Sequence, residues 1–110
     1  MSNKDQQIVE KIIKHITTTM GYCHGKSFEE FNTNSMLHEA CVFNLLQIGE
    51  LSNHLTDDFQ NEHPDIPWRL MVGLRNRLVH DYDGIRLMIV WQTITSDFEP
   101  LKKQLISSIS

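Results

Sequence analysis

The sequence has little of what several common kinds of protein need. Its 110 residues include only two cysteines, Cys23 and Cys41, whose spacing fits neither a disulfide framework nor a zinc motif. No apolar run approaches the roughly 20 residues of a membrane span, and residues 1–7 lack the apolar segment of a secretion signal. These absences predict one domain over residues 1–110 that is cytoplasmic, holds no metal and enters no membrane.

Familiar catalytic and cofactor-binding loops are also missing from the sequence. It contains no Gly-rich phosphate loop and no serine nucleophile elbow. Its scattered histidines form no paired metal-ligand spacing with a third ligand nearby. We therefore expect no cofactor, and any chemistry must come from ordinary side chains.

What is present is apolar periodicity at steps of three and four residues, which is typical of amphipathic helices. Ser27 and Glu30 form a capping box for a short helix, and Pro67 suits the first turn of another. Pro100 should kink or break the last helix, because it removes one backbone hydrogen bond. The predicted helices cover residues 5–21, 27–32, 35–60, 67–82 and a last stretch after Gly84. The fold class is therefore all-α, a small up-and-down bundle of four main helices.

Charge is distributed unevenly along the chain. The net charge is −4, which argues against wide coating of a nucleic acid. Four Lys and ten Asp or Glu give residues 1–68 a net charge of −6, whereas residues 69–110 carry +2. The basic groups therefore concentrate in the last third, where a local basic cleft could capture a phosphate strand.

The helix predicted over 67–82 carries the most informative group of polar residues. Arg75, Asn76, His80 and Tyr82 follow the pattern Arg-Asn-x-x-x-His-x-Tyr. Arg can hold a phosphate through two parallel hydrogen bonds, and His exchanges protons near neutral pH. Asn76 lies four residues before His80 and can orient the imidazole. Arg75 and His80 lie about 140° apart around the helix and would flank a groove.

Other residues near this motif have open interpretations. Arg77 is most simply an exposed basic residue that helps to hold a phosphate strand. Glu50, in the middle of the helix predicted over 35–60, is either a solvated carboxylate or a group that orients Arg75 or His80. Gly49 beside it could allow close approach of two helices. Asp81 is read as a solvated acid near a helix end.

The motif and its surroundings resemble a known family. The stretches Ile66-Pro67-Trp68-Arg69 and Gly73-Leu74-Arg75-Asn76-Arg77-Leu78-Val79-His80-Asp81-Tyr82 are similar to the HEPN superfamily, in particular to its HepT-like branch. Further matches, in the family's order, are Asn44-Leu45-Leu46-Gln47-Ile48-Gly49-Glu50 and Ile89-Val90-Trp91-Gln92-Thr93-Ile94. The resemblance covers nearly the whole chain.

The resemblance implies a small all-helical, HEPN-like homodimer with two motifs across a shared cleft. It implies a metal-independent endoribonuclease that is the toxin of a type VII-like toxin–antitoxin pair, with Arg75 and His80 as catalytic residues and Asn76 supporting. The partner would be a minimal, MntA-like nucleotidyltransferase antitoxin that transfers AMP to Tyr82.

A second hypothesis belongs to a different functional class. The same protein could be a non-catalytic helical partner that binds substrate for a minimal nucleotidyltransferase, with Tyr82 as AMP acceptor. Both hypotheses need the motif. The presence of both Arg75 and His80 favours the nuclease.

Overall fold

The structure is a computed structural model that describes residues 2–80 and 85–110. All regular structure in these two ranges is helical, and no strand occurs within them. In chain order the elements are α1 (Asn3–Cys23), α2 (Phe28–Thr33), α3 (Ser35–Asn53), α4 (Asp57–Glu62), α5 (Trp68–His80), α6 (Leu87–Gln92), the π-helical segment η2 (Thr93–Asp97) and α7 (Phe98–Ser108). The all-α prediction is confirmed.

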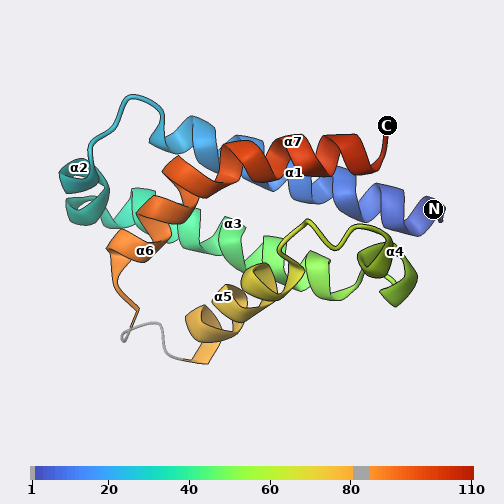
Figure 1. Cartoon of the computed structure of the whole chain (residues 1–110). Coiled ribbons are helices and arrows are strands. Elements are labelled where there is room, and N and C mark those ends of the chain that lie inside the picture. Colours follow the sequence, from blue (N-terminus) through green and yellow to red (C-terminus); the bar gives the residue numbers. More distant parts are fainter. Residues whose placement is uncertain (1, 81–84) are drawn as a thin grey trace.

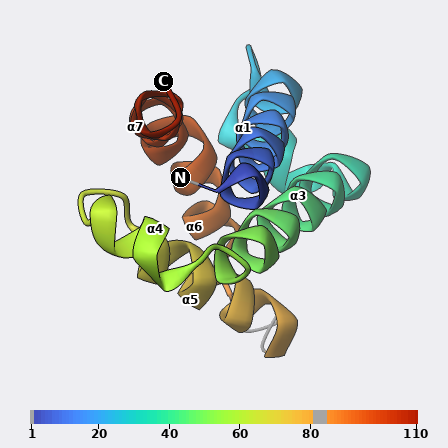
Figure 2. The same cartoon turned by 90° about the vertical axis from the view of Figure 1, so that its right-hand side faces the viewer.

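Successive long helices run in opposite directions along the long axis of the molecule (Figure 1). Seen along the bundle, α7, α1, α3 and α5 follow one another around it (Figure 2). Helix α1 contacts α3 and α7, and α3 contacts α5. The short helices α2 and α4 lie at opposite ends, and both chain termini lie at the α4 end. This is the predicted bundle of four main helical stretches.

Side-chain caps explain where several helices begin. Ser2 accepts a hydrogen bond from the Asp5 N–H at the start of α1. The predicted capping box is present at α2, because Ser27 and Glu30 each accept from the other's backbone N–H. Asn34 caps α3 through the Leu37 N–H. These caps satisfy backbone N–H groups that have no partner inside the helix.

The prediction that the long helix continues to about residue 60 was wrong. Helix α3 ends at Asn53, and a separate short helix, α4, follows from Asp57. Thr56 separates the two, with an extended backbone and a hydroxyl that accepts from the Phe59 N–H. Asp5 from α1 accepts hydrogen bonds from the N–H and the hydroxyl of the same Thr56. The residue at the break is therefore held by a local cap and by a tertiary contact that the apolar pattern does not contain.

Pro100 does not break the last helical stretch, although the sequence predicted a kink or a break there. The stretch passes from α6 through the π-helical η2 into α7, with Pro100 in the first turn of α7. Proline cannot donate a backbone hydrogen bond and crowds the carbonyl four residues earlier. A π-turn directly before it lets the chain remain helical with a wider local ring of hydrogen bonds.

The core fills the space between these helices. Most of its fully buried large side chains are aliphatic or aromatic; they include Val9, Ile12, Ile16, Phe31, Phe59, Val90, Ile94 and Leu105. On α5, Trp68, Met71 and Leu78 are buried as predicted, and Leu74 is half-buried. None of the helices in the described ranges is both long and apolar enough to span a membrane.

Candidate active site

Helix α5 carries the motif and is anchored at its first turn. The Trp68 indole N–H donates to the His63 carbonyl at 3.0 Å, and the Trp68 ring packs against Phe59 of α4. The Pro67 carbonyl accepts from the N–H groups of Leu70 and Met71. With Met71 and Leu78 turned into the core, the helix must present its polar residues to α3 and to solvent.

Arg75 points from α5 towards α3 and is held by two polar groups. Its Nη2 lies 2.9 Å from Oε2 of Glu50 on α3. Its Nη1 donates to the side-chain carbonyl of Asn76 at 2.9 Å. The Arg75 side chain is 31% exposed, so the guanidinium stays accessible while it is held.

Glu50 extends this group of side chains along α3. Its second oxygen, Oε1, accepts from Nε2 of His54 at 3.1 Å, one helical turn later. His54, Glu50, Arg75 and Asn76 therefore form a continuous polar chain across two helices, which we call the Arg75 network. Of the two interpretations of Glu50, the structure agrees with the one in which it contacts Arg75.

Gly49 explains how α5 comes close enough to α3 for this contact. A Cβ atom added at Gly49 would overlap Cβ of Arg75 and would lie 2.8 Å from its Cγ and 2.9 Å from the Met71 carbonyl oxygen. Real Cβ atoms essentially never come so close to other heavy atoms. The absence of a side chain at Gly49 therefore sets the distance between the two helices at the level of Arg75.

The expected contact between Asn76 and His80 is replaced by another. The Asn76 carbonyl turns to its neighbour Arg75 instead of reaching one turn ahead. His80 is the last residue of α5 and is exposed, and its imidazole makes no hydrogen bond to any residue in the ranges 2–80 and 85–110. The imidazole therefore faces solvent on the helix that also carries Arg75.

Two predictions near the motif fall outside the described residues. Tyr82, the expected AMP acceptor, and Gly84, the expected stop of the motif helix, both lie in the range 81–84. Helix α5 is described as far as His80, close to the predicted end at residue 82.

A groove of about 830 Å³ runs along the other side of α5, between it and the stretch η2–α7. Its floor is largely apolar, with Leu45 and Ile48 of α3 among its lining residues. Arg69, Gly73 and Arg77 line it from α5 at a spacing of four, which places them in one row. The sequence analysis did not single out Arg69 as a candidate binding residue. The available signal was its position eight residues before Arg77, which places both on one face of the helix. Leu70 beside the groove is 73% exposed.

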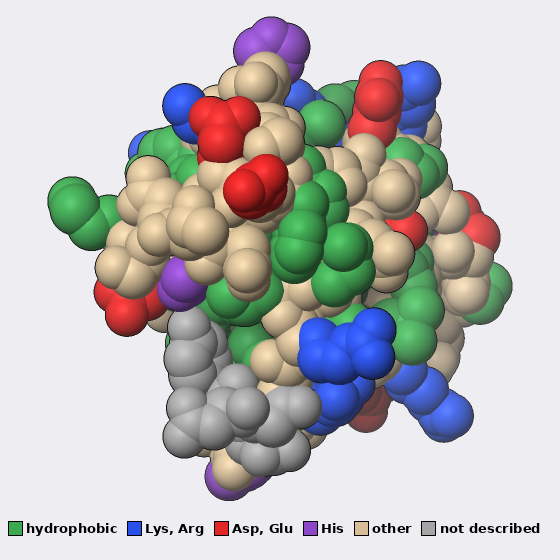
Figure 3. Space-filling model, turned by 90° about the vertical axis from the view of Figure 1, so that its left-hand side faces the viewer, with side chains coloured by type: hydrophobic (Ala, Val, Ile, Leu, Met, Phe, Trp, Pro, Cys, Tyr) green, Lys and Arg blue, Asp and Glu red, His purple; other side chains and the backbone are tan. Residues whose placement is uncertain are grey.

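The end of the molecule at which α2 and α6 lie shows basic side chains beside apolar ones. Figure 3 views this end and shows a cluster of Lys and Arg side chains at the lower right, bordered by hydrophobic surface. Most of the Asp and Glu side chains visible there lie apart from that cluster.

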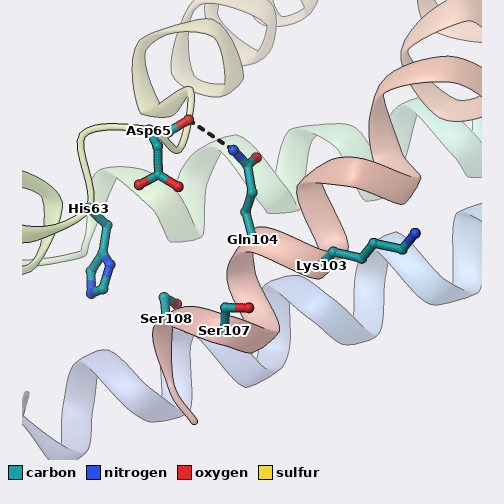
Figure 4. A pocket seen from close by; sticks show the side chains of 6 residues that line it. All are labelled: His63, Asp65, Lys103, Gln104, Ser107 and Ser108. Atoms are coloured by element: carbon teal, nitrogen blue, oxygen red, sulfur yellow. Dashed lines mark hydrogen bonds between the residues drawn. The ribbon is translucent and has the colours of Figure 1, made fainter.

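A second, smaller pocket of about 300 Å³ lies between the loop before α5 and the last turns of α7. Figure 4 shows its lining, in which Gln104 donates to the Asp65 carbonyl at 3.1 Å. The pocket mixes one lysine, one acid and two serines and contains no motif residue. In the part of the chain that the structure describes, no three His, Cys, Asp or Glu side chains gather as a metal site would require.

Comparison with known proteins shows which family this chain is similar to. The family model described as "Ribonuclease HepT-like" matches residues 7–107. The protein named "Probable ribonuclease HepT" in Thermococcus cleftensis is 31% identical over 102 residues, which cover 93% of each chain. A protein of Methanocaldococcus jannaschii, named as a candidate RNase, is 32% identical over 105 residues, covering 94% of this chain and 96% of the relative.

A further relative, also named as a candidate RNase, comes from Caldanaerobacter subterraneus subsp. tengcongensis. It is 33% identical over 96 residues, which cover 87% of this chain and 86% of the relative. No solved structure matches the chain at a significant level. The family match over residues 7–107 spans both the Arg75 network and the groove.

Proposed function

The chain belongs to the HepT-like ribonuclease family, and from this premise we propose that it is a metal-independent endoribonuclease. The observation that carries the proposal is the arrangement on α5. Arg75 is held at a fixed place by Glu50 and Asn76, and the exposed His80 follows five residues later on the same helix. A held guanidinium and an accessible imidazole suit attack within an RNA backbone.

The reaction would use a nucleophile that RNA itself provides. The ribose 2′-oxygen attacks the adjacent phosphorus and loses its proton to a base, and the bond from phosphorus to the 5′-oxygen breaks. The 5′-oxygen takes a proton from an acid. The products are a 2′,3′-cyclic phosphate and a 5′-hydroxyl. His80 serves as base or acid, and Arg75 neutralises charge that builds on the phosphoryl oxygens.

We further propose that the active form is a homodimer. The groove beside α5 supports this, because it is largely apolar, is lined by Leu74, and has the 73% exposed Leu70 at its side. Large exposed apolar surface of this kind usually marks a contact between proteins. A second copy packed against Leu70 and Leu74 would bring two motif helices together, so that one His80 can act as base and the other as acid.

As a toxin of a type VII-like pair, the protein would be controlled by a minimal nucleotidyltransferase, in the cytoplasm where its RNA substrate lies. The Tyr82 oxygen would take AMP from a nucleoside triphosphate, with release of pyrophosphate. The added phosphate would compete for Arg75, and the adenosine would obstruct RNA. Asn76 supports Arg75, and Arg77 contributes to holding RNA.

The test is RNA cleavage by the purified protein in EDTA, with and without His80→Ala. We expect cleavage by the unmodified protein, cyclic phosphate ends, and a rate lower by about 10²- to 10⁴-fold in the variant. Equal cleavage by both proteins would exclude His80 from the chemistry. No cleavage by either protein, together with a stable complex with a nucleotidyltransferase, would instead favour the non-catalytic partner.

A further inference from the structure

The two oxygens of Glu50 reach different partners. Oε2 contacts Arg75 of α5 at 2.9 Å, and Oε1 contacts His54, the C-cap residue just after α3, at 3.1 Å. The carboxylate therefore bridges the imidazole at the end of α3 and the guanidinium on α5. It is the link of the Arg75 network that joins the two helices.

This bridge contributes little to the stability of the fold. The side chains of Glu50 and Arg75 are 43% and 31% exposed. Ion pairs with this much solvent around them contribute about 0–1 kcal/mol. A role in folding is therefore a weak explanation for a carboxylate at this place.

The same contacts restrict Arg75 strongly. A free arginine side chain samples many rotamers, but here Gly49 packs against its Cβ and Cγ at the base. At the tip, Glu50 and Asn76 each engage one terminal nitrogen. Arginine has five N–H donors in a planar fork, so several donors stay available. The guanidinium is thus held at both terminal nitrogens, and its remaining N–H groups can bind a phosphate.

We propose that Glu50 is a positioning residue, which holds the Arg75 guanidinium in the orientation that the phosphate requires. Gly49 makes this possible by letting α5 approach α3. The inference rests on the proposed nuclease function and deepens it. It assigns to α3 a direct part in a site whose other residues all come from α5.

If Glu50 acts only through its charge, Glu50→Gln should improve the reaction; if Glu50 positions Arg75, the substitution should slow it. Removing a negative charge beside Arg75 should, by charge alone, tighten the binding of an anionic strand. Loss of orientation should instead slow the chemical step, because a misplacement of about 1 Å can cost on the order of 10²-fold. We therefore expect kcat to fall by about 10- to 10²-fold while KM stays equal or decreases.

The kinetic test compares Glu50→Gln with Glu50→Asp and with a matched control, Glu39→Gln. Glu39 is an exposed carboxylate on the same helix, so its variant makes the same change of charge without touching the Arg75 network. The control should keep the rate of the unmodified protein, and Glu50→Asp should recover part of the loss. In an Arg75→Ala background, Glu50→Gln should change the rate by less than about twofold, because the two residues act as one unit.

A measurement that needs no activity separates this inference from the nuclease itself. A guanidinium held by two partners rotates slowly about its C–N bonds, which separates the nitrogen NMR signals of its terminal groups. We expect separated signals for Arg75 in the unmodified protein and in Glu39→Gln, and merged signals in Glu50→Gln. If the protein cuts no RNA but shows this change, the nuclease proposal fails and the positioning of Arg75 stands. An unchanged kcat or unchanged Arg75 signals in Glu50→Gln would overturn the inference.

Discussion

The carboxylate of Asp5 binds Thr56, the N-cap residue of α4, which lies 51 residues later in the chain. One of its oxygens accepts from the Thr56 N–H at 3.0 Å, and the other accepts from the Thr56 hydroxyl at 2.8 Å. Asp5 is buried. Burial raises the pKa of this carboxyl, but the hydrogen bonds from Thr56 and Ser2 outweigh it and hold the pKa below its ordinary value of 3.8.

This contact makes part of the stability depend on pH. Because the pKa of Asp5 is lower in the folded protein, its contribution is complete well above pH 3.8 and is lost as the pH falls through that value towards the folded-state pKa. Asp5→Asn removes the charge and leaves one Thr56 donor without an acceptor. We expect it to lower the free energy of unfolding at pH 7 by about 1–3 kcal/mol.

The measurement is urea unfolding at several pH values from 7 down to about 3. The difference between the unmodified protein and Asp5→Asn should shrink as the pH falls. Glu39→Gln, an exposed carboxylate, serves as control and should change stability by less than about 0.5 kcal/mol. A difference that is constant over the whole range would show that Asp5 acts without its charge.

A second prediction concerns the close approach at Gly49. Alanine is a better helix former than glycine by about 1 kcal/mol, but in Gly49→Ala the new methyl meets Arg75 and the Met71 carbonyl. We expect the cost of this steric overlap to exceed the gain in helix propensity. The variant should lose about 1–3 kcal/mol of stability and should cleave RNA more slowly. Gly21→Ala is the matched control, because nothing lies within 4 Å of its Cβ, and it should stabilise the protein. A gain of stability in both variants would contradict the packing described here.

The third prediction separates the two neighbouring arginines of α5. Arg75→Lys keeps the charge but loses the planar fork that Glu50, Asn76 and a phosphate share, so kcat should fall by about 10²-fold or more. Arg77 is exposed and acts mainly through its charge, so Arg77→Lys should change kcat and KM by less than about twofold. Steady-state kinetics on one RNA at fixed salt compares the two. Equal effects of both substitutions would remove the special role of Arg75.

The fourth prediction concerns regulation at Tyr82. Co-expression with a partner nucleotidyltransferase should add the mass of one AMP group to the protein and abolish cleavage without loss of helical structure. Tyr82→Phe should carry no added mass and should stay active in the presence of the partner. Tyr22 is the other tyrosine of the chain and is 44% exposed, so Tyr22→Phe is the control and should still be modified. Retention of the added mass in Tyr82→Phe would place the modification elsewhere.

Much of the fold could be predicted because the signals are local. The helix at residues 27–32 follows from a capping box whose two partners lie three residues apart. The motif helix follows from Pro67 and from the spacing of Trp68, Met71 and Leu78. Hydrogen bonds and apolar spacings within a few residues of each other can be read directly from a sequence.

The tertiary structure decided what depends on partners that are distant in the chain. Helix α3 ends at Asn53, and Thr56, which caps the next helix, is held by Asp5. Asn76 binds Arg75 and not His80, because α5 packs with Arg75 against Gly49 and Glu50. The sequence by itself determined which side chains belong to the motif and which helix carries them. Only packing decided how Arg75 is oriented, because that depends on which face of α5 meets α3.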